Sequence, residues 1–443
     1  MKLRFAPSPT GLLHVGNARQ AVANALHARR HGGTFQLRID DTDPERSRDT
    51  YADAIRNDLR WLGLDWDESF SQSAHTADYA AAADRLRASG RLYPCFESEE
   101  ELHAKRELRL RQKRPPIYDR AMLRLTAEQR AQAEANGKIP YWRFKLSDGA
   151  VVWHDLVMGR TQVKLSAISD PVLIRADGTI LYAFASVVDD LRTSITDILR
   201  GEDHITNTGV QIDIALALGA APGHFRFGHL PLLLDAAGGK LSKRFDGLTL
   251  RALRQDGIEA SALVGYLARL GTSDDPQPLA IAELAAQYDV GHTSRSPSRF
   301  DMHQLLSLNR RVMHALPFAA VADRLPDGAT EAFWLAVRGN LDLLGEARHW
   351  WDVVAGSIVP PPLEGESEFL TQALSALPTE PWDEHVWSIW TKRLAELSGR
   401  RGRKLFLPLR VALTAEEKGP ELHELLLLMG RERVAGRLRH AAA

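Results

Sequence analysis

The chain has 443 residues, 44% of them hydrophobic, and its 56 lysines and arginines nearly balance 57 aspartates and glutamates, giving a net charge of −1. This length predicts about two to four domains, and the charge balance excludes a global attraction to nucleic acid, so an RNA ligand would need local basic patches. The single cysteine, Cys95, excludes an internal disulfide framework and a cysteine-rich zinc site. No apolar run has the length of a membrane span and the N-terminus lacks a signal pattern, so we expect a cytoplasmic protein with no membrane partner.

The first stretch of the chain is predicted to form a strand, a turn and the start of a helix. Apolar and cationic side chains alternate over residues 1–5, the Pro-Ser-Pro-Thr-Gly run must turn, and a helical pattern begins near Gly16. A second alternating strand over 35–39 completes a βαβ unit. Such a junction binds nucleotides, because the helix N-terminus presents unpaired N–H groups to phosphate. His14 in the turn could donate to phosphate oxygens, although prolines and glycine are also ordinary turn chemistry.

Three carboxylates, Asp40, Asp41 and Asp43, follow the second strand, at the end of a parallel sheet where ligands normally bind. For Asp41 and Asp43 an Asp-rich turn that caps the next helix is an equally good interpretation. Further helices are predicted at 51–68, 75–90, 99–114, 126–136 and from about 204 to 218, and strands within 141–165 and at 171–175 and 195–200. The composition changes between 96 and 186, which indicates a segment inserted into the sheet domain.

The second half of the chain begins with an apolar run, 229–234, that leads into a glycine-containing loop and the sequence Lys240-Leu241-Ser242-Lys243-Arg244. Paired lysines after flexible glycines suit a loop that closes over a polyphosphate. Beyond residue 245 the pattern is helical, with helices predicted at 259–270, 279–287, 329–355, 383–398 and 420–438. Trp382, Trp387 and Trp390 stand at helical spacing, which favours a core position over base stacking.

Two groups of cations are candidate nucleic-acid patches, although such groups are more often solvated helix faces. They are Lys105, Arg106, Arg109, Arg111, Lys113 and Arg114, and then Arg393, Arg400, Arg401, Arg403 and Lys404.

The sequences HVGN at 14–17 and KLSKR at 240–244 together resemble the "HIGH" and "KMSKS" signatures of class I aminoacyl-tRNA synthetases. The surrounding words RFAPSPTG, RIDDTD, YDR, VVDD, RGEDH and HLPLLL resemble glutamyl-tRNA synthetases in particular, from about residue 3 to about residue 310. The resemblance implies an α/β Rossmann-type catalytic domain split by an inserted domain and followed by a helical anticodon-binding region. The implied divisions are 1–95 and 187–244 for the two catalytic halves, 96–186 for the inserted acceptor-stem domain, 245–300 for a helical stem-contact domain and 301–443 for the anticodon-binding domain.

The resemblance further implies that L-glutamate is activated by ATP as glutamyl-adenylate and transferred to the 3′ end of tRNA, with release of pyrophosphate and AMP. We expect Mg²⁺ to accompany ATP, no structural zinc, and a monomer. The implied catalytic residues are His14, Lys240 and Lys243. The implied ATP-binding residues are Pro7, Thr10, Gly11, His14, Gly16, Asn17, Asp203, Leu233, Lys240, Ser242, Lys243 and Arg244. The implied glutamate-binding residues are Arg4, Ala6, Ser8, Asp40, Tyr182, Ser186 and Arg200, with Arg4 facing the side-chain carboxylate.

Several positions depart from the pattern of this family. Asp40 stands where glutamate is usual, Ala183 where histidine is frequent and Ser186 where asparagine is frequent, so contacts in the amino-acid pocket are rearranged. Some relatives carry a cysteine-rich zinc knob directly after the position of Cys95. Here Glu97 follows and partner cysteines are absent from the sequence, which is why we expect no zinc.

Three alternatives to the charging of glutamate tRNA are open from the sequence. The enzyme could charge chiefly glutamine tRNA for later amidation, a choice that lies within residues 300–443. It could instead be a tRNA-modifying paralogue, although such proteins resemble only the catalytic half. A non-catalytic RNA-binding protein would be marked by loss of the histidine or the second lysine, and both His14 and Lys243 are present.

Overall fold

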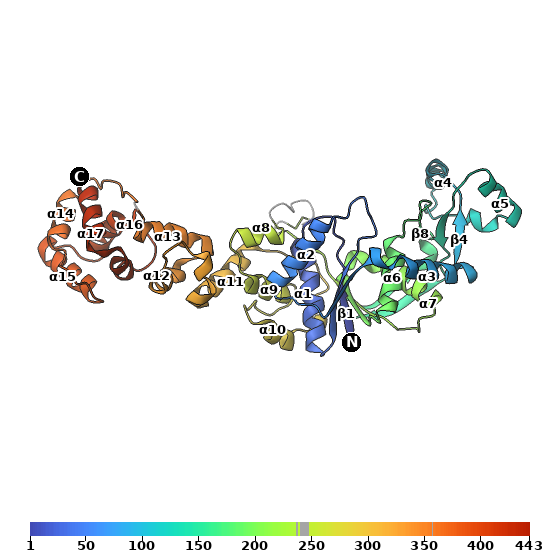
Figure 1. Cartoon of the computed structure of the whole chain (residues 1–443), viewed down its shortest axis with the longest axis horizontal. Coiled ribbons are helices and arrows are strands. Elements are labelled where there is room, and N and C mark those ends of the chain that lie inside the picture. The colour runs from blue at the N-terminus through green and yellow to red at the C-terminus, as the bar shows by residue number, and fades with distance from the viewer. Residues whose placement is uncertain (236–237, 240–247, 357) are drawn as a thin grey trace. The chain divides into compact units, whose positions relative to one another are not determined.

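In the computed structural model of the chain, the described residues are 1–235, 238–239, 248–356 and 358–443 (Figure 1). They divide into two compact units: unit 1 holds residues 1–253 and 263–301, and unit 2 holds 254–262 and 302–443. Within these ranges, no helix is long and apolar enough to cross a membrane. The described strands all lie in unit 1, whereas unit 2 is built from helices.

A five-stranded parallel sheet forms the centre of unit 1. Its order is β10-β9-β1-β2-β3, with β10 at Arg226–Leu230, β9 at Asp197–Gly201, β1 at Lys2–Phe5, β2 at Thr34–Ile39 and β3 at Glu68–Ser71. Helix α1, Val15–Arg30, connects β1 to β2 and packs against both strands; Figure 1 shows it beside β1. The chain leaves this sheet after β3 and returns to it at β9, so the predicted βαβ unit and the split α/β fold are confirmed.

The central strands are buried more completely than alternation predicted. Five of the six residues of β2 are buried, because both faces of a parallel sheet are normally covered. Arg38 on this strand is 0% exposed, and Arg4 on β1 is also buried. Strand β3 was missed, because its sequence Glu-Ser-Phe-Ser lacks an apolar run and it lies at the sheet edge.

A second sheet in unit 1 is antiparallel and contains β4 at Leu92–Cys95, β5 at Tyr141–Phe144 and β8 at Val172–Ile174. Residues 92–95, assigned above to the first half of the catalytic domain, therefore pair here and not in the parallel sheet. The proline of β4 fits an edge strand, where a missing N–H costs no ladder bond. A hairpin of β6, Ala150–Asp155, and β7, Gly159–Lys164, follows β5.

Unit 1 also contains helices, most of them following a strand of one of these sheets. They are α2 at Asp49–Trp61, α3 at Thr76–Ala88, α4 at Glu99–Arg111, α5 at Ala127–Ala135, α6 at Tyr182–Arg192, α7 at Ile205–Ala217 and α10 at Ile281–Gln287. Helices α8, Leu250–Gln255, and α9, Ala260–Arg269, and the short strands β11, Leu233–Leu234, and β12, Ser298–Arg299, complete the described elements up to residue 301. Phe144, Phe184 and Leu173 belong to one buried cluster that joins α3, α6 and α7 to the antiparallel sheet.

A hydrogen-bonded cluster around Glu97 fastens the start of α4 to the antiparallel sheet. The Glu97 carboxylate accepts from the hydroxyls of Tyr118 at 2.9 Å and Tyr141 at 3.2 Å, and from Lys105 Nζ at 2.7 Å. The Cys95 thiol lies 3.6 Å from the Tyr118 hydroxyl, and burial raises its pKa to about 11. The described residues contain no group of three or more His, Cys, Asp or Glu side chains arranged to hold a metal ion.

Unit 2 consists of α11 at Met302–Ala315, α12 at Glu331–Val337, α13 at Ala347–Val354, α14 at Ser367–Ser375, α15 at Val386–Ser398, α16 at Arg403–Thr414 and α17 at Leu422–Ala442. The single helix predicted over 329–355 is wrong, because 3₁₀ turns between α12 and α13 interrupt it. Trp390 is 0% exposed and its Nε1 donates to the Ala373 carbonyl at 2.8 Å, which confirms its core position. Trp387 stacks on Phe406 and is half-buried.

Candidate active site

Unit 1 contains a cavity of 590 Å³ at the carboxyl ends of β1 and β9. An adjoining cavity of 300 Å³ shares Ser8, Thr10 and Tyr182 with it and reaches Asp40. The predicted site residues that line the larger cavity are Arg4, Ala6, Pro7, Ser8, Thr10, Gly11, His14, Asn17, Tyr182, Arg200 and Asp203. Gly16, Ser186 and Leu233 do not line either of these cavities, and Lys240, Ser242, Lys243 and Arg244 lie outside the described residues.

His14 is the N-cap of α1. Its Nδ1 accepts from the Gly16 backbone N–H at 3.0 Å, and the Asn17 side chain returns a bond by accepting from the His14 N–H at 3.2 Å. A Cβ at Gly16 would stand 2.9 Å from the His14 ring, so glycine is required for this close approach. This capping satisfies two helix-terminal donors and fixes the direction of the ring.

Burial lowers the pKa of His14 to about 4. The ring is therefore neutral at pH 7, and its one N–H is on Nε2 because Nδ1 accepts from Gly16. His14 can therefore donate a hydrogen bond to a phosphate oxygen but supplies no net charge.

Arg4 lines the cavity, and its guanidinium is paired with a carboxylate of the protein. Its Nε and Nη2 donate to the two Asp190 oxygens at 3.0 and 3.3 Å. Arg38 Nη1 donates to the same carboxylate at 2.6 Å, and Arg38 Nε donates to Asp40 at 2.6 Å. The two arginines and two aspartates form a neutral buried cluster, which we call the paired cluster.

Ser186 lies against the paired cluster and does not line either cavity. It is 0% exposed, and its Oγ accepts from Arg38 Nη2 at 3.0 Å. Burial raises the pKa of Asp40 to about 6 although Arg38 lies beside it. Arg38 and Asp190 were not assigned roles from the sequence, and the signal that could have found them is a charge placed inside a buried strand or helix pattern.

Arg200 on β9 is in a different environment. It is 3% exposed, its Nη1 donates to the Tyr182 hydroxyl at 3.1 Å, and its Nη2 donates to Thr208 Oγ1 at 2.5 Å. Its Nε is buried without a hydrogen-bond partner, and among the described residues it forms no ion pair. Desolvation, with a contribution from the Arg4 charge, lowers the pKa of Arg200. The cavity wall thus contains a cation that meets hydroxyls and no carboxylate.

Asp41 and Asp43 stabilise the loop after β2 and do not cap the next helix. Asp41 accepts from the Ser73 N–H and hydroxyl at 2.8 and 2.7 Å, and Asp43 accepts from Arg46 Nε at 2.8 Å. The N-cap of α2 is Arg48, without a side-chain cap bond. The capping interpretation is therefore wrong for both residues.

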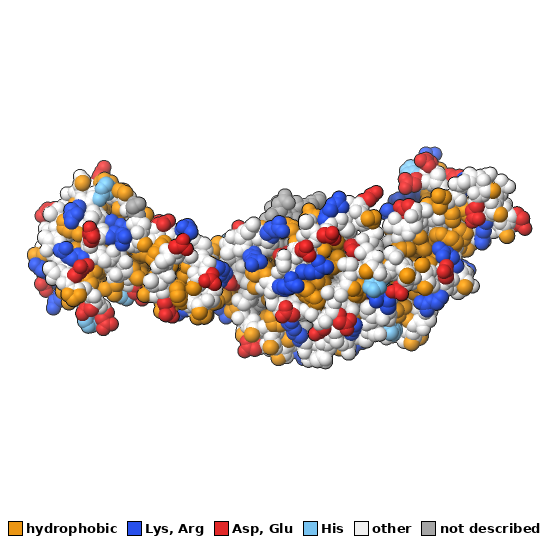
Figure 2. Space-filling model, viewed as in Figure 1, with side chains coloured by type: hydrophobic (Ala, Val, Ile, Leu, Met, Phe, Trp, Pro, Cys, Tyr) orange, Lys and Arg blue, Asp and Glu red, His pale blue; other side chains and the backbone are white. Residues whose placement is uncertain are grey.

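The basic groups noted in the sequence are partly neutralised. Lys105 pairs with Glu97 and Asp119, and Arg400 pairs with Glu366 and lies over the Phe369 ring. Figure 2 shows basic side chains gathered in the middle of the view, over the part of unit 1 where Figure 1 places α1 and α2.

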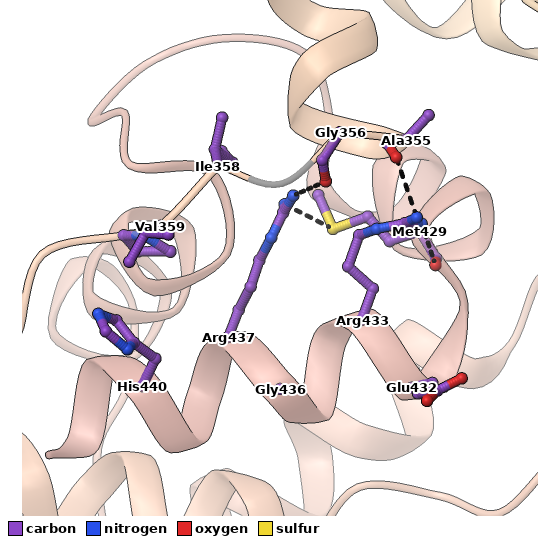
Figure 3. A pocket seen from close by; sticks show the side chains of 11 residues that line it. Ala355, Gly356, Ile358, Val359, Met429, Glu432, Arg433, Gly436, Arg437 and His440 are labelled. Atoms are coloured by element: carbon purple, nitrogen blue, oxygen red, sulfur yellow. Dashed lines mark hydrogen bonds between the residues drawn. The ribbon is translucent and has the colours of Figure 1, made fainter.

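Unit 2 has its own cavity of 830 Å³, lined in part by Arg433 and Arg437 on α17 (Figure 3). Arg433 Nη2 donates to the Ala355 carbonyl at 3.0 Å, and Arg437 Nη1 donates to the Leu413 carbonyl at 2.6 Å. These carbonyls lie at the C-terminal ends of α13 and α16, where cations are stabilised by the helix dipole. The positions of these two charges are therefore explained by their bonds to carbonyls at helix C-terminal ends.

Comparison with known proteins identifies relatives over the whole chain. Residues 1–307 match the family described as "tRNA synthetases class I (E and Q), catalytic domain", and residues 363–442 match "Anticodon binding domain". The chain is 69% identical over 442 residues to "Glutamate--tRNA ligase 2" of Gluconacetobacter diazotrophicus, with 100% of both chains covered. It is 64% identical to the protein of that name from Gluconobacter oxydans, covering 100% of this chain and 99% of the relative.

Solved structures share the fold. A glutamate tRNA ligase from Elizabethkingia meningosepticum, crystallised in complex with its amino acid, superimposes with a TM-score of 0.88 at 24% identity, covering 100% of this chain and 99% of that one. The glutamate-tRNA synthetase of Elizabethkingia anophelis gives a TM-score of 0.87 at 24% identity, with the same coverage of the two chains.

Proposed function

The chain belongs to the class I tRNA synthetases for glutamate and glutamine, and on this premise we propose that it ligates L-glutamate to the 3′ end of tRNA at the expense of ATP. The glutamate α-carboxylate oxygen attacks the α-phosphorus of ATP, and the bond to pyrophosphate breaks. A hydroxyl of the terminal adenosine of tRNA then attacks the acyl carbon of glutamyl-adenylate, and AMP leaves. Mg²⁺ enters with ATP, where phosphate oxygens and water supply its ligands.

The observation that carries this proposal is Arg200, a buried cation in the cavity wall without a carboxylate partner among the described residues. Such a charge is stabilised when an anionic ligand completes it. We infer that Arg200 and Tyr182 receive the side-chain carboxylate of glutamate, with Arg4 beside them and already paired to Asp190. A glutamine amide offers one acceptor and turns an NH₂ group toward these donors, which rejects it.

The phosphate side of the site is assigned to the start of α1. Its N-terminal N–H groups attract phosphate, and the neutral His14 donates from Nε2 to a phosphate oxygen. Pro7, Thr10, Gly11 and Asn17 line the same cavity, and we assign them to ATP. Gly16, Asp203, Leu233, Lys240, Ser242, Lys243 and Arg244 complete the proposed ATP site, and the two lysines supply the cations that stabilise charge on the reacting phosphate.

The domain roles follow the same proposal. Residues 1–91 and 187–244 form the catalytic domain, and strand β4 at 92–95 joins the acceptor-stem domain, which then covers 92–186. Residues 245–300 contact the tRNA stem, and 301–443, which contain the match to an anticodon-binding domain, bind the anticodon. That match speaks against a tRNA-modifying paralogue, which would carry the catalytic half alone. We propose a cytoplasmic monomer without structural zinc that charges the glutamate tRNA. Attachment of glutamate to glutamine tRNA would use the same chemistry at the 3′ end.

ATP–pyrophosphate exchange with glutamate, run with and without bulk tRNA, tests the first step, and aminoacylation of each purified tRNA tests the second. Lys243→Ala should lower exchange at least about 100-fold with unchanged folding. His14→Asn should do the same while preserving the N-cap, whereas His14→Ala should also lose about 1 kcal/mol of stability. Near-normal exchange in Lys243→Ala would contradict the assignment of the lysines, and absence of glutamate-dependent exchange in the unaltered protein would contradict the function.

A further inference from the structure

A series of buried hydrogen bonds leads from the β6–β7 hairpin to Arg200. Asp155 Oδ2 lies 2.5 Å from His229 Nδ1, and His229 Nε2 lies 2.8 Å from Thr208 Oγ1. The Thr208 hydroxyl in turn accepts from Arg200 Nη2 at 2.5 Å. His229 and Thr208 are 0% exposed and Asp155 is 1% exposed. These three residues, which we call the relay, connect the hairpin to the cavity wall through the protein interior.

Asp155 determines which ring nitrogen of His229 donates a hydrogen bond within the relay. Its Oδ1 accepts from the backbone N–H groups of Val157, Met158 and His229, each at 3.0 Å. Burial opposes its ionisation, but these bonds and His229 hold the pKa of Asp155 at about 2. An ionised carboxylate only accepts hydrogen bonds, so His229 Nδ1 carries a proton and donates to Asp155, and in the neutral ring Nε2 is then the acceptor.

The tautomer of His229 decides how the Thr208 hydroxyl points. A hydroxyl has one proton, and when that proton is given to His229 Nε2, the lone pairs are turned toward Arg200. The other available acceptor, the His204 carbonyl, lies farther from Thr208 Oγ1, at 3.2 Å. The hairpin itself is bonded to the parallel sheet, because the Leu156 N–H donates to the Phe227 carbonyl of β10 at 2.8 Å.

Arg200 depends on this support more than the other arginines of the site. No carboxylate within the described ranges holds its guanidinium, so Tyr182 and Thr208 alone fix the two Nη atoms. Bidentate recognition of a carboxylate requires the plane of the guanidinium to be fixed. Resting on the proposed function, we propose that Thr208, His229 and Asp155 are positioning residues that orient Arg200 toward the side-chain carboxylate of glutamate and thereby set selectivity against glutamine.

Thr208→Val and Thr208→Ser form a matched pair for the test, because valine has the shape of threonine without the hydroxyl and serine keeps the hydroxyl. The full-length variants are compared in ATP–pyrophosphate exchange with tRNA present. We expect Thr208→Val to raise the KM for glutamate about tenfold and to lower the preference for glutamate over glutamine, with the KM for ATP unchanged within about twofold. Thr208→Ser should restore both values. An unchanged KM for glutamate in Thr208→Val, or an equal rise for both substrates, would overturn the proposal.

His229→Gln provides a second variant and a test of connection. Alone it should raise the KM for glutamate, and in the Thr208→Val background it should add nothing, because the two residues act through one bond. Additive effects would show that His229 does not act through Thr208 and would overturn the relay. Absence of glutamate-dependent exchange in the unaltered protein would instead overturn the proposed function, so the two failures are distinguishable.

Discussion

Two groups of buried arginine lie on neighbouring strands of the parallel sheet and differ in their counter-charges. Arg4 and Arg38 of the paired cluster share the carboxylates of Asp40 and Asp190. Arg200 donates hydrogen bonds to the hydroxyls of Tyr182 and Thr208, lies over the Phe227 ring and has no ion-pair partner among the described residues. Buried charges are stable when paired, so the paired cluster is complete without a ligand, whereas Arg200 is the cation for which we propose an anionic ligand. The comparison separates charges that pair with each other inside the protein from the one that we propose recognises the substrate.

Removing the unpaired cation should have the largest effect on activity. We expect Arg200→Met to lower kcat/KM for glutamate by at least about 10³-fold, because the side-chain carboxylate loses its charged partner. Thermal unfolding should show no loss of stability, since an uncompensated buried charge has been replaced by an apolar side chain of similar length.

Arg4→Lys is the matched variant for that measurement. It should lower stability as well as activity, because an ammonium group cannot make both bonds to Asp190. If Arg4→Lys lowers kcat/KM more than Arg200→Met does, Arg4 and not Arg200 recognises the side-chain carboxylate of glutamate.

Removing a carboxylate from the paired cluster should have the largest effect on stability. Asp190→Asn leaves Arg4 and Arg38 with Asp40 as their remaining anion, so we expect a loss of about 3–5 kcal/mol in urea-induced unfolding. Asp203→Asn is the control, because this carboxylate is exposed and its loss should change stability by about 0.5 kcal/mol or less. Equal stability of the two variants would contradict the structural role of the paired cluster.

Another substitution would make the Arg200 environment resemble the paired cluster. Thr208→Asp places a carboxylate beside Arg200, which should neutralise it and weaken glutamate binding about 100-fold. Glutamate binding measured by calorimetry checks this outcome. Retained affinity would mean that the charge of Arg200 is not what the substrate recognises.

The smallest expected effect concerns acid stability. The pKa of Asp155 is about 2 in the folded protein, below its ordinary value of 3.8, so the folded state binds the proton less tightly than the unfolded state. Its contribution, about 2 kcal/mol, is fully present above pH 4 and is lost as the pH falls toward 2. The difference in unfolding free energy between the unaltered protein and Asp155→Asn should therefore shrink over this interval. A constant difference from pH 6 to pH 3 would contradict the assignment.

Local patterns in the sequence predicted the elements that surround the site, but they could not predict pairings between residues that are far apart in the sequence. The turn at His14 and the strand that carries Arg4 could be placed because periodicity and turn residues act over a few neighbouring positions. Arg4 and Asp190 are separated by 186 positions, so no local pattern reveals that the arginine is already neutralised. The same reason explains why Ser186 was assigned to the cavity and lies against Arg38.

The limits of local patterns also explain the remaining differences in the fold. Strand β3 forms because the neighbouring β2 supplies hydrogen bonds, with Gln36 opposite Glu68, and not because its own residues favour burial. The helix predicted over 329–355 failed because turns at 338–346 interrupt a continuous apolar pattern. In both cases the tertiary surroundings outweigh the local preference.

The Glu97 cluster determines how the start of α4 responds to its chemical environment. A structural zinc ion binds through deprotonated ligands, so a site of that kind weakens when a chelator or metal scarcity removes the ion. The bonds from Lys105, Tyr118 and Tyr141 to Glu97 are made by groups that the chain always carries. The folded structure of this segment should therefore not change with zinc supply or with chelators. It should be lost instead when the protein is heated or acidified.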